Sequence, residues 1–437
     1  MKLFFKQFYI KIEKVSRIDI FLMILVSFFP LLMILSIFLA DLFASLSSII
    51  IVYISIKKKN FFKNIKYQSF FFLSFYSIIL LSLIFSYSIE NSFLPSFFYF
   101  RYFLFALAIY YLIEHHVYFR RIFFYSLLIT LSFVIFDSLF QAYFKFNTIG
   151  LHIQDDTTKF VSSFFDDEKK LGSYIIRLLP LTLSTVYYFN LRKISIYIIL
   201  FSGLVIFFSS ERTAMFLFVF FLISYLFIIK NKIKFICISS LMILLIFSLN
   251  PNLKYKYFDY TLKQLGLIDT TWNQDYNNIV RYYSKEHENL SLTASFIFKK
   301  NYLNGIGIKN FYEVCNLHKA NKNEEQKKYF DYFKRNNNIQ CSTHPHNTYL
   351  QILSEIGIFG FLIIFYIFIF IIRKNIKIIL KQDFRNIKIS YYLINIGILI
   401  NLFPLIPSGN FFNNWLSLIL FYPLGMWFYL NKRLNIK

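Results

Sequence analysis

Residues 341–360, CSTHPHNTYLQILSEIGIFG, place groups capable of proton chemistry at the start of an otherwise apolar run. His344 and His346 are separated by one proline, and Asn347 follows directly. An imidazole at a water-accessible edge has a pKa near working pH, so it can accept a proton from a hydroxyl or orient a substrate. The pattern predicts a general base or substrate-orienting histidine here, with Asn347 contacting substrate beside it.

Two other interpretations of this stretch stay open. Two histidines supply half of a typical zinc site, but no evident cluster of Cys, Asp or Glu at ligand spacing accompanies them, so we predict no metal and no other cofactor. Thr348 and Gln351 fit a capping box, which would make part of the polarity a helix start signal. Glu355 lies about two turns further along, too deep for a cap, and we expect it to bind substrate or orient the histidine.

Charged residues recur inside or between other apolar runs, at Arg101, Asp137, Arg177 and Arg212. A charge in hydrocarbon costs a few kcal/mol, so such groups normally face a bundle interior or a wet cavity. The planar guanidinium suits phosphate oxygens. The four residues therefore predict one positively biased pocket for an anionic ligand, most simply a phosphate or diphosphate on a lipid. The competing interpretation is that each arginine reaches the headgroups or pairs with Asp137.

A long polar segment, 250–345, adds further basic residues. An amphipathic helix is predicted around 281–300, with Gly305 suited to a helix C-terminus. Arg281 and Lys285, four residues apart, lie on or near this helix and are candidate substrate contacts. The competing interpretation is a solvated lid face.

The elements that position these residues are membrane helices. The chain has 437 residues, 57% hydrophobic and 22% aromatic, with a mean hydropathy of +0.53, which is outside the range of soluble domains. The formal net charge of +24 could suggest nucleic acid, but the lysines occur in short bursts between apolar runs, which indicates membrane topology and no nucleic-acid partner. No small-residue cleavage site follows the first run, so we expect no removable signal peptide.

We predict an all-α integral membrane protein with about 12 transmembrane helices and one long periplasmic loop. The predicted spans are 18–40, 42–56, 67–86, 97–113, 122–143, 172–190, 194–208, 213–229, 233–249, 347–372, 389–404 and 411–431.

Basic residues orient these spans. The predicted inner segments hold most of the Lys and Arg between spans, whereas the short outer segments hold only Lys145, Lys159, Lys169, Lys170 and Arg212. The positive-inside rule then puts both termini in the cytoplasm. The predicted topology divides the chain into nine transmembrane helices in 1–249, a periplasmic loop subdomain in 250–345, and three transmembrane helices in 346–437.

Two of the three cysteines fall in the predicted outer loop. Cys315 and Cys341 would lie on the oxidising side of a bacterial inner membrane, whereas Cys237 lies in a span. We therefore predict a disulfide between Cys315 and Cys341, which would anchor the segment that enters the histidine motif.

Seven stretches together resemble the O-antigen ligase and polymerase family of bacterial inner-membrane glycosyltransferases. They are FRYFLFALAIYYL at 100–112, FDSLFQAYFKFNTIG at 136–150, LGSYIIRLLPL at 171–181, SSERTAMFLF at 209–218, NGIGIKNF at 304–311, the histidine motif at 341–360, and FPLIPSGNFFNNW at 403–415.

The resemblance implies a GT-C-like enzyme of the bacterial inner membrane that takes a glycan from undecaprenyl diphosphate and transfers it on the periplasmic face. Ligases use lipid A core as acceptor, and polymerases use another carrier-linked repeat. Members are thought to work without a metal, with arginines at the diphosphate and a histidine near the acceptor. By motif position, the resemblance implies three catalytic groups. The first is Arg212, and the second is Arg281, or Lys285 in place of Arg281. The third is His344 or His346, of which we favour His346.

Three functions follow. The first is an inverting, metal-independent O-antigen ligase that uses a lipid A core or similar acceptor. The second is an O-antigen polymerase with the same chemistry. The third is a flippase or transporter of the lipid-linked glycan that performs no chemistry.

Overall fold

The computed structural model describes residues 15–58, 65–153, 160–267, 281–282, 284–321, 324–332 and 339–434. Within these ranges the chain consists of helices and connecting loops, and its one isolated β-bridge joins Phe146 and His152. The all-helical class predicted from the sequence is confirmed for this part of the chain.

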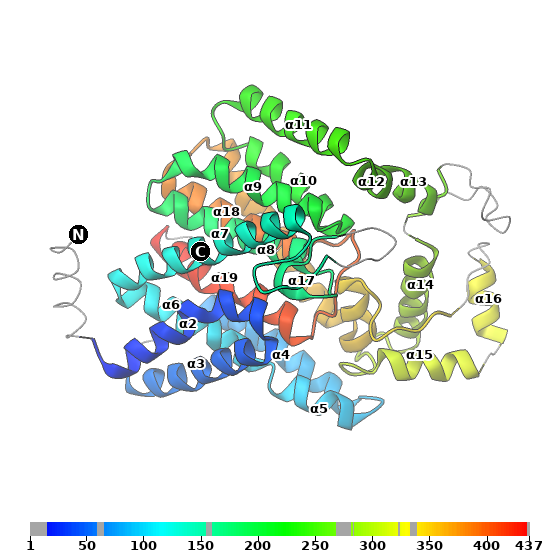
Figure 1. The fold of residues 1–437 in the computed structure, drawn as a ribbon. Coiled ribbons are helices and arrows are strands. Elements are labelled where there is room, and N and C mark those ends of the chain that lie inside the picture. The colour runs from blue at the N-terminus through cyan, green and yellow to red at the C-terminus, as the bar shows by residue number, and fades with distance from the viewer. Residues whose placement is uncertain are drawn as a thin grey trace.

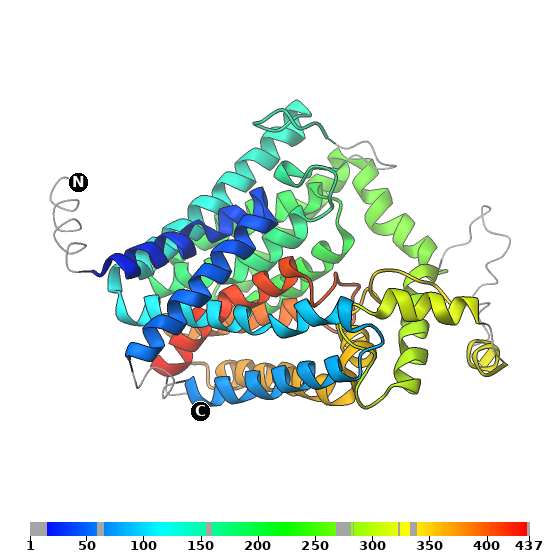
Figure 2. The same cartoon turned by 90° about the horizontal axis from the view of Figure 1, so that it is seen from below.

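Most helices run side by side in a bundle (Figures 1 and 2). Those before the long polar segment are α2 (Arg17–Leu35), α3 (Ile37–Lys57), α4 (Lys66–Ile84), α5 (Ile89–Phe97), α6 (Phe100–His115), α7 (Val117–Phe144), α8 (Leu171–Tyr188), α9 (Ser195–Phe208), α10 (Arg212–Leu226) and α11 (Lys232–Leu249), with short 3₁₀ turns η2 (Ser163–Phe165) and η3 (Arg192–Ile194). Those after it are α17 (Thr348–Leu380), α18 (Asn386–Asn401) and α19 (Asn414–Arg433).

Each predicted span coincides with a helix, with shifted ends. The first two spans separate at Ser36 rather than near 41, because the Ser36 hydroxyl accepts the N–H of Leu39 and so caps the start of α3. In the part of the chain that the structure describes, six helices are long and apolar enough to cross a membrane: α2, α3, α4, α7, α17 and the continuous segment Ile89–His115. Membrane-type helices are therefore present, and a total of twelve crossings stays a prediction.

The middle of the bundle is α8, which is buried along almost its whole length. It packs against α18 and α9, while α19 packs against α6. At the α8–α18 crossing the Ser184 and Ser390 hydroxyls hydrogen-bond at 2.7 Å, and Gly397 faces Pro180. Small and hydroxyl residues let membrane helices approach closely, so the polar N-terminal turn of α8 is held rigidly inside the protein.

The long segment folds into further helices at one end of the bundle, which we call the loop end (Figure 1). They are α12 (Pro251–Lys254), η4 (Tyr255–Asp259), α13 (Tyr260–Gln264), α14 (Lys285–Lys300), α15 (Phe311–Ala320) and α16 (Glu324–Tyr332). A small hydrophobic cluster that includes Ile297 and Phe311 holds α14 to α15. Cys315 and Cys341, the pair predicted from the sequence, are joined by a disulfide with their Cα atoms 5.6 Å apart.

The segment after α14 packs into a break in α17. The Gly307 N–H donates to the Glu355 carbonyl at 2.9 Å, and the Ile358 N–H donates to the Tyr302 carbonyl at 2.9 Å. Gly357 interrupts α17 with a φ of 78°. Gly305, expected at the end of the preceding helix, lies beyond it, because α14 ends at Lys300; its backbone instead packs directly on that of Glu355.

We expect Gly357→Ala to destabilise the protein strongly. A Cβ at this position would overlap the Leu303 carbonyl, and the backbone would hold alanine in the left-handed region. Together these cost roughly 3 kcal/mol. The matched control is Gly150→Ala, where φ is +91° but no atom lies within 4 Å of the added Cβ, so only about 1 kcal/mol is lost.

The measurement is the apparent melting temperature of each variant in detergent. Equal losses in the two variants would show that backbone conformation alone, and not the contact with Leu303, explains the effect.

Candidate active site

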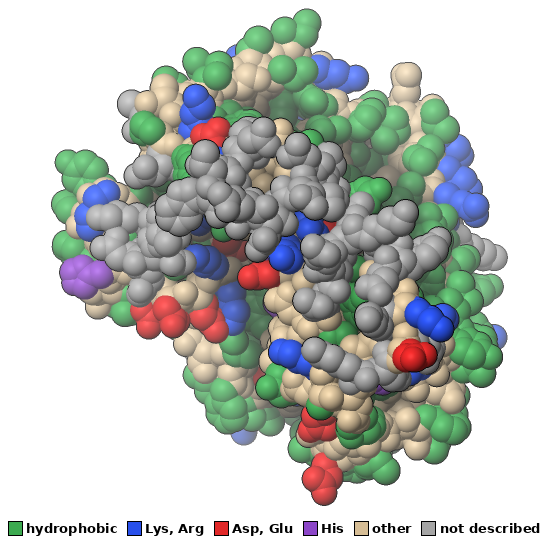
Figure 3. All heavy atoms as spheres, turned by 90° about the vertical axis from the view of Figure 1, so that its right-hand side faces the viewer, with side chains coloured by type: hydrophobic (Ala, Val, Ile, Leu, Met, Phe, Trp, Pro, Cys, Tyr) green, Lys and Arg blue, Asp and Glu red, His purple; other side chains and the backbone are tan. Residues whose placement is uncertain are grey.

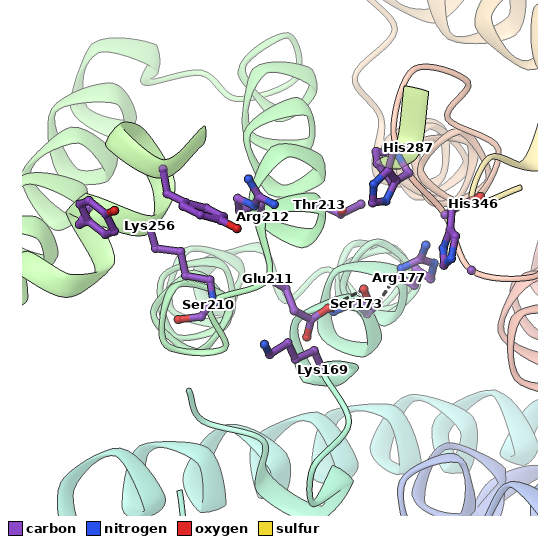
Figure 4. A pocket seen from close by; sticks show the side chains of 15 residues that line it. Lys169, Ser173, Arg177, Ser210, Glu211, Arg212, Thr213, Lys256, His287 and His346 are labelled. Atoms are coloured by element: carbon purple, nitrogen blue, oxygen red, sulfur yellow. Dashed lines mark hydrogen bonds between the residues drawn. The ribbon is translucent and has the colours of Figure 1, made fainter. Parts of the chain in front are cut away.

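A cavity of about 830 Å³, which we call the chamber, lies where the first turns of α8 and α10 meet η4, α13, α14 and the segment 407–409 (Figure 4). Lys and Arg side chains also gather on the molecule's surface at this end (Figure 3). The chamber is lined by Lys169, Ser173, Arg177, Ser210, Glu211, Arg212, Thr213, Tyr255, Lys256, Tyr260, His287, His346, Pro407, Ser408 and Gly409.

Two arginines form the cationic wall of the chamber. Arg177 is 5% exposed; its Nη1 donates to the Ser173 carbonyl at 3.2 Å, and its Nε has no hydrogen-bond partner among the described residues. Arg212 donates to Gln264 Oε1 at 2.6 Å and lies 5.2 Å from the Tyr260 ring. Four Lys or Arg side chains line the chamber against one carboxylate, so an anion is favoured inside it.

That carboxylate, Glu211, ties α10 to α8. It accepts the N–H of Gly172 at 2.6 Å and both the N–H and the hydroxyl of Ser173, at 3.1 and 2.7 Å. Burial raises the pKa of Glu211 to about 7, although these hydrogen bonds act in the opposite direction. A carboxylate at the N-terminus of α8 also interacts favourably with the helix dipole. The contact fixes the two arginines on adjacent walls.

Three imidazoles form a row, with His346 in the middle, on the side of the chamber next to Arg177. The His346 ring lies 4.1 Å from that of His344 and 5.4 Å from that of His287, centroid to centroid. His346 has a left-handed backbone with a φ of 54°, and its carbonyl accepts the N–H of Ser408 at 2.8 Å. Figure 4 shows the His346 side chain next to Arg177.

The histidine environment favours neutral rings. Burial lowers the pKa of His344 to about 4, and the nearby His346 lowers it further. Burial also lowers the pKa of His346, while a hydrogen bond with the Ser408 backbone acts in the opposite direction. The pKa of His287 is lowered by burial and then by His346. A neutral imidazole can accept a proton, so the row is suited to general-base chemistry.

The structure brings some of the predicted site residues together. Arg177, Arg212 and His346 line the chamber, and His344 packs behind His346. The expectation of one pocket for all charged residues is wrong in two cases. Arg101 lines a different cavity, where it pairs with Asp41 at 3.0 Å.

Asp137 is the second case. It is fully buried and accepts hydrogen bonds from the N–H and hydroxyl of Thr148 at 2.9 and 2.6 Å, and from the Ser163 hydroxyl. These bonds fasten the end of α7 to the following loop, so Asp137 holds the fold and does not line the chamber.

The polar stripe on α17 supports the chamber wall instead of lining it. Asn347 is the N-cap, since its side chain accepts the N–H groups of Tyr349 and Leu350. Gln351 does not complete the predicted capping box; its amide donates to Glu355 at 3.0 Å and to Asn410 at 2.8 Å. These bonds hold the segment that passes behind the chamber, and among the described residues the Glu355 carboxylate pairs with Gln351 and does not line the chamber.

The predicted loop cations also lie outside the chamber. Arg281 precedes α14 instead of lying on it, and its guanidinium pairs with the buried Glu288 at 2.8 Å. Lys285 is two residues from His287, which places their side chains roughly 200° apart around a helix. Because His287 faces the chamber, Lys285 faces away from it.

Sequence reasoning missed several lining residues. Glu211 lies inside a quoted stretch, directly before Arg212, and His287 lies on the helix predicted around 281–300, but neither was selected as a site residue. Lys256 and Tyr260 lie on short helical segments that carry no motif. Among the described residues there is also no group of three or more His, Cys, Asp or Glu side chains arranged to hold a metal ion.

Residues 197–365 match the family model described as O-Antigen ligase. The matched range runs from α9 into α17 and contains Arg212, Glu211 and the three chamber histidines, whereas Arg177 precedes it. No curated protein matches the chain. This match supports the resemblance seen in the sequence and places an O-antigen ligase domain at residues 197–365.

Proposed function

We propose that this protein is an O-antigen ligase-like glycosyltransferase that moves a glycan from undecaprenyl diphosphate to a lipid A core or similar acceptor on the periplasmic face of the inner membrane. The observation that carries the proposal is the buried, incompletely hydrogen-bonded guanidinium of Arg177 beside Arg212 in the chamber. A buried cation without a full set of partners is costly, and a diphosphate would supply the missing acceptors.

The chemistry of the leaving group explains why two arginines are needed. An acceptor hydroxyl attacks the anomeric carbon of the glycan, and the bond from that carbon to the diphosphate oxygen breaks with the electron pair leaving on oxygen. Negative charge therefore grows on the diphosphate in the transition state. Arg177 and Arg212, fixed in advance by Ser173 and Gln264, stabilise that charge without reorganising.

His346 takes the proton of the attacking hydroxyl. It lines the chamber next to Arg177, and its lowered pKa keeps the ring neutral and able to accept a proton. Attack from the side opposite to the diphosphate inverts the anomeric centre. His344 behind it and His287 beside it act as positioning residues through their rings.

We expect Arg212→Ala to lower kcat for glycan transfer by about 100-fold or more, because one transition-state donor is lost. Arg212→Lys keeps the charge but loses the planar fork, so it should retain partial activity. The matched control is Arg192→Ala, which removes an arginine bonded to Asn386 and far from the chamber lining. Transfer is measured in proteoliposomes with undecaprenyl diphosphate glycan and core lipid, with and without a chelator.

Unchanged transfer by a well-folded Arg212→Ala protein would remove this mechanism. Movement of the carrier lipid across the bilayer with no transfer by the wild type would instead support the transporter. In cells lacking the gene, bare core with accumulated carrier-linked polymer indicates a ligase, and core with one repeat indicates a polymerase.

The decrease in transfer caused by histidine protonation should begin only below about pH 6.5, whereas Glu211, whose pKa is raised to about 7, is protonated already near neutral pH. The reason is that the folded-state pKa values of His344 and His346 lie below the ordinary value of about 6.5, so both rings remain neutral through neutral pH. The measurement is kcat/KM against pH. Two declines are therefore expected, and a profile with no decline below about pH 6.5 would contradict the assignment of a neutral histidine base.

The free energy of unfolding should also decrease as the solution becomes acidic. Between pH 6.5 and about 4 the unfolded chain binds a proton at His344 that the folded chain does not, so the free energy of unfolding decreases as pH falls through this window. His344→Gln removes this titration and should flatten the melting temperature against pH, which separates the effect from general acid unfolding.

A further inference from the structure

A second cavity, of about 650 Å³, lies between α3, α5 and the start of α6. Its polar wall consists of Asp41, Arg101, Lys309 and Asn414. None of these residues lines the chamber. The function proposed above therefore leaves this cavity unused.

The polar wall is held in place by a dense set of hydrogen bonds. Arg101 donates to both oxygens of Asp41 through Nε and Nη2, at 3.0 to 3.1 Å. Asn414 donates to Asp41 at 3.1 Å, and Tyr102 donates to Asn414 at 3.0 Å. Asp41 neutralises one positive charge, so the wall keeps an excess cation in the exposed Lys309, whose backbone is left-handed with a φ of 64°.

The rest of the cavity is apolar and open to the surroundings. Along α3 its lining runs from Asp41 through Ser45 to Val52, a rise of roughly 16 Å. Ile49 and Leu94 line it while remaining 67% and 62% exposed. A charged end followed by an exposed apolar groove matches an amphiphile with an anionic headgroup and a hydrocarbon chain.

One segment forms a wall of both cavities. Ser408 lines the chamber and bonds to His346, and Asn414, six residues further on, lines the second cavity and bonds to Asp41. Between them, the Phe411 N–H donates to Gln351 at 2.8 Å. A headgroup in the second cavity would therefore lie across a single segment of chain from the proposed base.

We propose that the second cavity binds the phosphate headgroup of the lipid that accepts the glycan. The inference rests on the proposed function, which requires two amphiphilic substrates at the same end of the protein. The chamber holds the donor diphosphate, and an acceptor that is a phosphorylated lipid needs its own cationic site beside an apolar groove. Lys309 and Arg101 contact the phosphate, and α3 and α5 contact the hydrocarbon chain.

Binding is tested with the full-length protein in a neutral maltoside detergent, using dodecyl phosphate as the probe and native mass spectrometry to count bound copies. We expect two binding events in the wild type. Lys309→Gln should weaken one of them at least fivefold, and Arg212→Ala should weaken the other. The control is Lys145→Gln, which removes a cation whose backbone is also left-handed but which lines neither the chamber nor the second cavity.

Two further arms identify the ligand chemistry. The double variant with Asp41→Asn and Arg101→Gln keeps the net charge and should abolish the same event as Lys309→Gln. Inorganic phosphate should compete at least tenfold less well than dodecyl phosphate, because it lacks the chain. Equal competition would assign the cavity to a free anion, and unaltered binding in Lys309→Gln would overturn the site; both outcomes reject the proposal.

The transfer assay tests the role of the lipid. Lys309→Gln should raise KM for the acceptor at least fivefold while kcat and KM for the donor stay unchanged. A rise in donor KM, or no change in acceptor KM, would overturn the assignment to the acceptor. If the wild type transfers no glycan, the proposed function fails, whereas the dodecyl phosphate result still reports independently on the cavity.

Discussion

The contact between the Glu211 carboxylate and the first turn of α8 is the constraint on which the chamber depends. A buried carboxylate requires donors, and Gly172 and Ser173 supply them from the positive end of a helix. Gly172 is needed for this approach, since a Cβ there would meet the Ser209 hydroxyl and Glu211 itself. Arg212 follows Glu211 directly, and Arg177 lies about one turn after Ser173 in α8. The contact therefore holds two like charges on adjoining walls against their mutual repulsion.

The three imidazoles are held in place by contacts other than the Glu211 carboxylate. His346 stands at the start of α17 in a left-handed conformation that Asn347 and Ser408 hold in place. Further along, α17 is broken at Gly357, and the segment after α14 fills the break with backbone hydrogen bonds. The helix that carries His287, α14, is therefore connected to α17, the helix that begins directly after His346 and Asn347. The row of rings thus belongs to one packed unit.

Periodicity and the positions of charges predicted much of this arrangement. Apolar runs give helix positions directly, so each expected span coincides with a helix; charges near the ends of spans selected Arg177 and Arg212, and the histidine motif and the family resemblance selected His346. Side-chain partners were less predictable. Asp137 and Arg281 each bond to residues that the chain reaches through a loop, 11 and 7 positions further on, and no local pattern encodes which partner is near.

The separation of Arg101 from Arg177 has a geometric origin. A sequence reports how deep a residue lies along a helix, because depth is proportional to residue number. It does not report which way that helix face points in the bundle, which tertiary packing decides. Both arginines were correctly placed early in their helices, yet α6 turns Arg101 toward α3 while α8 turns Arg177 toward α10. Two cavities with cationic side chains, separated by the segment from 408 to 414, fit the proposed reaction between two anionic lipids, since each headgroup would then meet its own counter-charge without competing for the other's.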